Sequence, residues 1–86
     1  MSLNTKGKPN KIYPAFNDDD LMQFGKHRGE RLSDVPASYF SWLYNQSDDP
    51  LVEYVGLGTS QSCKLANYIY NSRNAINSEI GTNEIN

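Results

Sequence analysis

The sequence has very few of the residues that build disulfides and metal centres. Among 86 residues there is one cysteine, Cys63, and one histidine, His27. One cysteine excludes an intramolecular disulfide, and together the two residues are too few for a zinc site of the usual four-ligand kind. We therefore expect no metal and no cofactor.

Long apolar runs are also missing. No hydrophobic stretch approaches the roughly 20 residues that a helix needs to cross a bilayer. The first residues, Met1-Ser2-Leu3, lack the apolar core of a signal peptide. We therefore expect no membrane partner and a cytoplasmic location.

The sequence also lacks an excess of basic residues. The formal net charge is −2, which argues against a protein that coats nucleic acid with a wholly basic surface. However, Lys26, Arg28 and Arg31 lie with His27 within six positions of the chain. Any nucleic-acid binding is therefore expected to be local.

The stretch that contains these residues has the pattern of a β-hairpin. Two short alternating segments flank a polar tip, and Gly25 and Gly29 bracket that tip. Glycine at such positions supplies a positive φ or lets the backbone approach another group closely. Val35-Pro36 ends the second strand, because proline has no N–H and favours extended geometry in the residue before it.

A helix is predicted after Pro36. Tyr39, Trp42 and Leu43 fall at i, i+3 and i+4 and so share one face, with Phe40 on its edge. We expect this face to form the core together with Phe24 of the hairpin.

Two further helices are predicted downstream. Pro50 begins a short helix over residues 51–55, which the Gly-Leu-Gly segment 56–58 ends. Thr59 or Ser60 then caps a third helix, in which apolar residues recur at helical spacing. The pattern is lost after residue 74, so the chain is expected to fray there.

These elements predict an α+β fold, with a β-hairpin packed on about three short helices. The length suffices for one domain only. We expect a flexible N-terminal arm over residues 1–17, one small domain over 18–75 and a flexible C-terminal tail over 76–86. Within the arm, the apolar segment Ile12–Phe16 is expected to dock on the domain, with partner binding as the alternative.

Catalysis is not predicted. The Asp18–Asp20 run lacks the glycine and glutamate spacing of a cation-binding loop, so we interpret it as solvated. Cys63 and His27 are the one candidate pair of a nucleophile and a base. However, Cys63 belongs to the apolar stripe of a helix, and His27 belongs to the polar tip far from it in sequence. We therefore expect that the protein is not an enzyme.

The motif resembles a known family. The small C-terminal domain of exodeoxyribonuclease X-like proteins, and small bacterial and phage proteins, share the pattern F-G-K-H-K-G, V-P and Y-L-x-W-L. Here Arg28 replaces the usual lysine and Phe40 the usual leucine. The matching positions are Met22, Phe24, Gly25, Lys26, His27, Arg28, Gly29, Leu32, Asp34, Val35, Pro36, Tyr39, Trp42 and Leu43. The resemblance implies an accessory role in DNA metabolism without catalysis, because the catalytic carboxylates of those nucleases lie in a separate domain.

The expected function is weak, sequence-independent binding of a nucleic-acid backbone. The residues expected to contact phosphates are Lys26, His27, Arg28 and Arg31. The residues expected to hold the hairpin in place are Phe24, Gly25, Gly29, Pro36, Tyr39 and Trp42. Neutralising about three or four phosphates on a single strand gives a salt slope of roughly −2 to −3. The expected partners are single-stranded or duplex DNA and a nuclease or helicase, and no oligomeric state is indicated.

Two alternatives remain open at this point. The tip also has the composition of a solvated turn, in which Lys26 or Arg31 pairs with Glu30 or Asp34. The other alternative is a protein–protein interaction module without nucleic-acid binding, because partly exposed aromatic side chains make good interface anchors. Its candidate anchors are Tyr13, Phe16, Phe40, Tyr44, Tyr54 and Tyr68.

Overall fold

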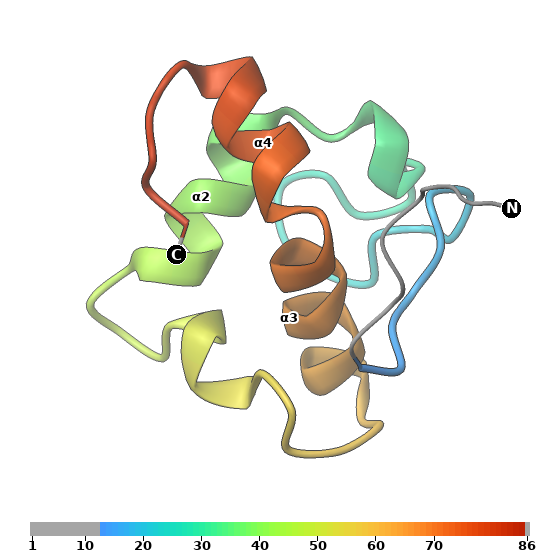
Figure 1. Ribbon diagram of the computed structural model, residues 1–86. Helices are drawn as coiled ribbons and strands as arrows, with labels where there is room; N and C mark the ends of the chain where they lie inside the picture. Colours follow the sequence, from blue (N-terminus) through green and yellow to red (C-terminus); the bar gives the residue numbers. More distant parts are fainter. Residues whose placement is uncertain (1–12, 86) are drawn as a thin grey trace, which may run out of the picture.

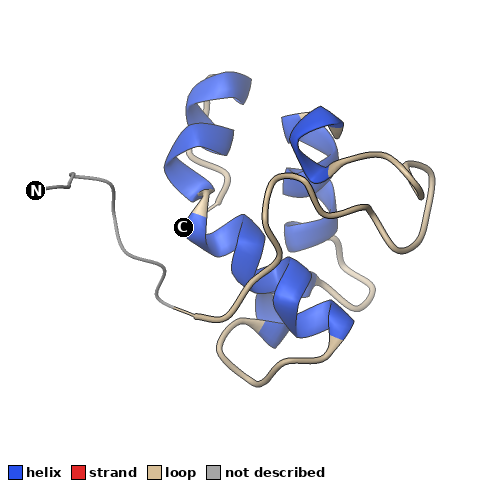
Figure 2. Cartoon of the chain, turned by 90° about the vertical axis from the view of Figure 1, so that its right-hand side faces the viewer, coloured by secondary structure: helices blue, strands red, loops and turns tan. Residues whose placement is uncertain are grey.

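A computed structural model describes residues 13–85, and within them the chain forms helices and loops but no β-strand (Figures 1 and 2). The elements in chain order are the 3-10 helix η1 (Leu32–Asp34), α2 (Ala37–Asn45), the 3-10 helix η2 (Leu51–Tyr54), α3 (Gln61–Asn71) and α4 (Arg73–Ile80). The predicted α+β class is therefore wrong, and the described part of the chain has a helical fold.

The loop before η1 folds back on itself without forming the predicted hairpin. One isolated antiparallel bridge joins Leu21 to Arg31, and the N–H of Met22 donates to the carbonyl oxygen of Glu30 at 2.8 Å. Turns occupy the residues between these pairs, and η1 begins directly after Arg31. Neither arm stays extended long enough to make a strand.

The helix boundaries follow ordinary local rules. Pro36 precedes the first residue of α2 with an extended ψ of 140°. The hydroxyl oxygen of Ser60 accepts the N–H of Cys63 at 3.2 Å and so caps α3. This confirms Ser60 as one of the two predicted caps. The predicted second helix is present as the shorter η2, and Gly56 follows it with a φ of +77°.

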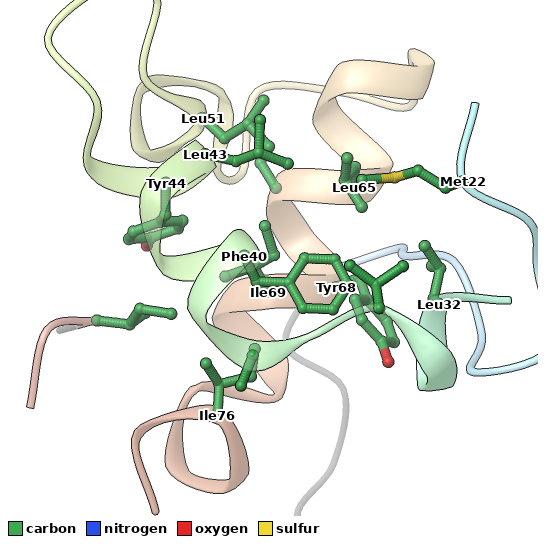
Figure 3. Close-up of a cluster of buried hydrophobic side chains, with 14 residues drawn as sticks. Met22, Leu32, Phe40, Leu43, Tyr44, Leu51, Leu65, Tyr68, Ile69 and Ile76 are labelled. Atoms are coloured by element: carbon green, nitrogen blue, oxygen red, sulfur yellow. The ribbon is translucent and has the colours of Figure 1, made fainter. Parts of the chain in front are cut away.

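The core lies between the helices and receives side chains from the loop. Helix α2 packs against α4 and η2, and α3 packs against η2, α4 and α2. Figure 3 shows Met22 pointing from the loop toward Leu65 of α3, and Phe40 of α2 pointing toward Ile69 and Tyr68. The labelled members of the cluster are Met22, Leu32, Phe40, Leu43, Tyr44, Leu51, Leu65, Tyr68, Ile69 and Ile76.

Helix α2 buries a different face from the one predicted. Phe40 and Tyr44 are 3% and 2% exposed, whereas Trp42 is 54% exposed. Leu43 is buried as predicted, but Phe24 is 36% exposed and lies outside the core. The helix is therefore rotated about its axis relative to the prediction, which leaves the tryptophan on the surface.

The chain after residue 75 is folded where a frayed tail was predicted. Ile76 in α4 is buried, and so is Ile85 beyond it. The side-chain amide of Asn77 donates to the carbonyl oxygen of Ile85 at 2.7 Å and accepts the N–H of Ile85 at 3.0 Å. These two hydrogen bonds hold the C-terminal segment against α4, beside α2 (Figure 1). The predicted domain boundary at residue 75 thus falls inside a helix.

The described part of the predicted N-terminal arm docks on α3. The side-chain amide of Asn67 donates to the carbonyl oxygen of Pro14 at 2.8 Å, and that of Asn71 donates to the carbonyl oxygen of Tyr13 at 3.2 Å. Docking is therefore confirmed for residues 13–16, while residues 1–12 lie outside the described residues. No helix within residues 13–85 has the length and apolar character needed to cross a membrane.

Candidate nucleic-acid interface

The basic tip, residues 24–31, is shaped by its two glycines. Gly25 and Gly29 have φ values of +81° and +88°, a region that residues with a side chain rarely adopt. A Cβ on Gly25 would lie 2.6 Å from the hydroxyl oxygen of Tyr39, whereas a Cβ on Gly29 would meet nothing within 4 Å. Both glycines therefore supply a positive φ, and Gly25 also allows close approach to α2.

His27 connects the tip to α2. Its Nδ1 lies 3.1 Å from both carboxylate oxygens of Glu30, and its ring meets the ring of Tyr39 edge-on with centroids 4.6 Å apart. The imidazole is partly buried between these two groups. His27 thus has a packing role in addition to the phosphate contact predicted from the sequence.

The other three predicted phosphate-binding residues remain available to a ligand. Lys26, Arg28 and Arg31 are exposed, and their side chains make no hydrogen bond or ion pair with any residue of the described chain. The carboxylate of Glu30 faces the histidine instead, and the pairing with Glu30 or Asp34 that would neutralise the tip is not found among residues 13–85. The tip therefore presents exposed cationic side chains that are not neutralised by an ion pair within the described chain.

Some backbone N–H groups of the tip donate hydrogen bonds within the protein, and others have no acceptor in the described chain. The N–H groups of Arg28 and Gly29 donate to the carbonyl oxygens of Gly25 and Met22, at 3.2 and 2.9 Å. The N–H groups of residues 25–27 have no acceptor within the part of the chain that the structure describes. Backbone donors for an anion are thus concentrated at the first half of the tip.

An exposed tryptophan beside the tip was assigned to the core from the sequence. The rings of Tyr39 and Trp42 are stacked, with centroids 5.7 Å apart and an interplanar angle of 30°. Because His27 contacts Tyr39 in turn, the three rings form a continuous aromatic row from the tip to the surface of α2. Trp42 also borders a shallow groove of about 260 Å³. The other residues that line this groove are Ser38, Ser41, Asn45, Gln46 and Glu84.

The acidic run before the tip has structural hydrogen bonds. A carboxylate oxygen of Asp18 accepts the hydroxyl of Tyr68 at 2.7 Å, and one of Asp20 accepts the N–H of Asn17 at 2.7 Å. Burial, followed by the hydrogen bond to Asp18, raises the pKa of Tyr68 above its ordinary value. Within residues 13–85 no three His, Cys, Asp or Glu side chains are grouped so that they could hold a metal ion.

Cys63 and His27, the candidate pair that the sequence does not favour as catalytic, have different neighbours in the structure. Cys63 is buried in α3, and its sulfur lies 4.0 Å from the position of a Cβ on Gly58. His27 instead contacts Glu30 and Tyr39 at the tip.

The aromatic anchors of the protein-interaction alternative lie mostly inside the fold. Phe40, Tyr44 and Tyr68 are buried, and the other three candidates are partly buried. The large apolar side chains exposed in the described chain are Leu21, Phe24, Trp42, Val52 and Leu57.

No family model, no curated protein and no solved structure matches this chain. The resemblance to the C-terminal domain of exodeoxyribonuclease X-like proteins stays a prediction. The functional argument therefore depends on the geometry and charge of the tip.

Proposed function

We propose that this protein is a non-catalytic accessory in DNA metabolism that binds nucleic-acid backbones weakly and without sequence preference through its basic tip. One observation carries the proposal. Lys26, Arg28 and Arg31 make no ion pair within residues 13–85, while the single carboxylate of the tip is held by His27. A cluster of unpaired cations on a slightly acidic protein favours a small anionic ligand surface, such as a few phosphates.

The geometry supports phosphate as the contacted group. The N–H groups of residues 25–27 have no acceptor within the described chain, and the exposed cations Lys26 and Arg28 belong to the same turn. Backbone donors in a glycine-shaped turn together with Lys or Arg form a common kind of anion site. Because few phosphates are neutralised, binding is expected to be weak and strongly salt-dependent.

The side chains of α2 beside the tip support binding without sequence preference. Over residues 38–42 of α2, the part of the helix next to the tip, the side chains that are not buried belong to a serine, a tyrosine and a tryptophan, and none is an arginine, asparagine or glutamine that could read base edges. The family resemblance adds a nuclease or helicase as the proposed partner, and the proposed location stays the cytoplasm.

Charge reversal at one cation tests the proposal. Fluorescence anisotropy of labelled single strands and duplexes of about 12 nucleotides, a length within the range that small modules cover, is measured at about 50 and 200 mM salt. Arg28→Glu is expected to weaken binding several-fold and to flatten the salt slope. Lys64→Glu is the matched control, because it makes the same change in net charge on α3, where Lys64 lies over the ring of Phe16.

Two results contradict the proposal. One is the absence of binding at tens of micromolar protein in low salt. The other is an equal loss of binding in Arg28→Glu and Lys64→Glu, because a general charge effect would then replace a local site.

A further inference from the structure

The only tryptophan of the chain stands on the surface next to the basic tip. Trp42 is 54% exposed, although a tryptophan buries much apolar surface when it is placed in a core. Its position is fixed on one side by stacking with Tyr39, which itself contacts His27 of the tip. The row of rings therefore starts among the cations and ends at a free aromatic surface.

We propose that the nucleic acid bound at the tip is single-stranded and that one of its unpaired bases stacks on the indole ring of Trp42. This inference rests on the proposed function and names the class of ligand. Aromatic platforms beside a positively charged track are the usual means of binding single strands, because every base offers a π-face while the phosphates follow the cations. A duplex offers its phosphates to the tip, but its bases are already stacked inside the helix.

The surroundings of Trp42 separate a base site from a phosphate site. The groove that Trp42 borders is lined by polar but uncharged side chains and by the carboxylate of Glu84. Glu84 accepts a hydrogen bond from the hydroxyl of Ser41, and a negative group there disfavours a phosphate. A strand lying across this face therefore places its backbone over Lys26 and Arg28, and its base toward the groove.

Contacts within the protein itself support the aromatic row. Gly25 lies against the hydroxyl of Tyr39, and Glu30 holds the imidazole of His27. Because the ring of Trp42 already stacks on Tyr39, less side-chain freedom is lost when a base stacks on it than for an unsupported ring. A preorganised ring makes one stacking contact useful even in a weak complex.

Intrinsic fluorescence gives a direct test, because all tryptophan emission of the protein comes from Trp42. Three probes are compared: a strand of about 12 thymidines, an abasic strand of the same length and charge, and a duplex of that length. The thymidine strand is expected to quench the emission, and the other two are not. Its affinity is expected to exceed that of the abasic strand by about 5- to 150-fold, the range for one stacked base.

Substitutions separate stacking from charge. Trp42→Ala is expected to lower the affinity for the thymidine strand to that for the abasic strand and to leave the abasic affinity unchanged, whereas Trp42→Phe keeps part of the difference. Leu57→Ala is the matched control, because it removes another exposed apolar side chain and lies on the segment after η2. It is expected to change none of the affinities.

The outcomes distinguish this inference from the proposed function. Equal affinity for thymidine and abasic strands, both weakened by Arg28→Glu, overturns base stacking and leaves backbone binding by the tip intact. An equal loss for all three probes in Trp42→Ala also overturns it, since Trp42 would then only support the shape of the tip. Binding of none of the probes contradicts both proposals.

Discussion

Replacing Ile85 with alanine is expected to remove a large share of the stability of the fold. The side chain of Ile85 is 2% exposed and belongs to the main hydrophobic cluster. Truncating a buried isoleucine to alanine costs about 2–5 kcal/mol, because transfer energy is lost and a cavity is left. A chain of 86 residues has a free energy of unfolding of roughly 4–13 kcal/mol. A loss of about 3 kcal/mol is thus easily measured.

The same segment offers a second, coupled perturbation. Asn77→Ala removes both hydrogen bonds between the side chain of Asn77 and the backbone of Ile85. The N–H and carbonyl groups of Ile85, which are partly buried, then lose their partners, and each unpaired group costs up to about 1–3 kcal/mol of stability. Because both substitutions release the same segment from α4, the double variant is expected to lose less stability than the sum of the single losses.

Urea unfolding followed by far-ultraviolet circular dichroism measures these changes. With a slope of about 1 kcal/mol per molar urea, a loss of about 3 kcal/mol lowers the midpoint by about 3 M. Asn83→Ala is the control, because Asn83 lies in the same segment and is exposed. Equal midpoints for the wild type, Ile85→Ala and Asn83→Ala would refute the reasoning, and the segment would then be the frayed tail that the sequence predicts.

Two further predictions concern the tip and the core. Gly29→Ala is expected to lower the free energy of unfolding by about 1–2 kcal/mol because of its positive φ alone. Gly25→Ala is expected to lower it more, because the new Cβ would also clash with Tyr39. Equal melting temperatures for the wild type and the two variants in thermal scans would contradict this. The raised pKa of Tyr68 comes first from burial and then from the hydrogen bond to Asp18, so the unfolded chain releases this proton at lower pH than the folded one. Stability is therefore expected to fall above about pH 10, the ordinary tyrosine pKa. This loss of stability should be smaller in Tyr68→Phe. Parallel curves of unfolding free energy against pH for the wild type and Tyr68→Phe would contradict the prediction.

The two glycines of the tip were predictable from the sequence, but the strands beside them were not. Gly25 and Gly29 have the expected positive φ, because a tight turn places the same demand on the backbone in any fold. The alternating segments next to them are short, and an isolated two-stranded hairpin is only marginally stable. The apolar residues of this loop, Met22 and Leu32, are buried against the helices instead, so packing fixes its path together with a few backbone hydrogen bonds between its two arms.

The orientation of α2 shows a second limit of local patterns. Residues 39, 42 and 43 fall on one helical face, but Ala37, Phe40, Ser41 and Tyr44 also follow the spacing i, i+3, i+4 and i+7. The two faces share similar apolar character, so periodicity alone does not choose between them. The structure buries the second face, because α4 packs on α2, whereas the sequence pattern predicts a frayed tail over most of α4.

The exposure of Trp42 therefore depends on residues far away in the chain. The hydroxyl of Ser41 donates to the carboxylate of Glu84, and the side-chain amide of Asn45 donates to the carbonyl oxygen of Glu84 at 3.0 Å. Ile85 of the same segment is buried, so these contacts hold Ser41 and Asn45 against the C-terminal segment and leave Trp42 at the border of the groove that these residues line. A motif confined to residues 21–45 contains the cations and the aromatic row, but the C-terminal segment decides which of those rings a ligand can reach.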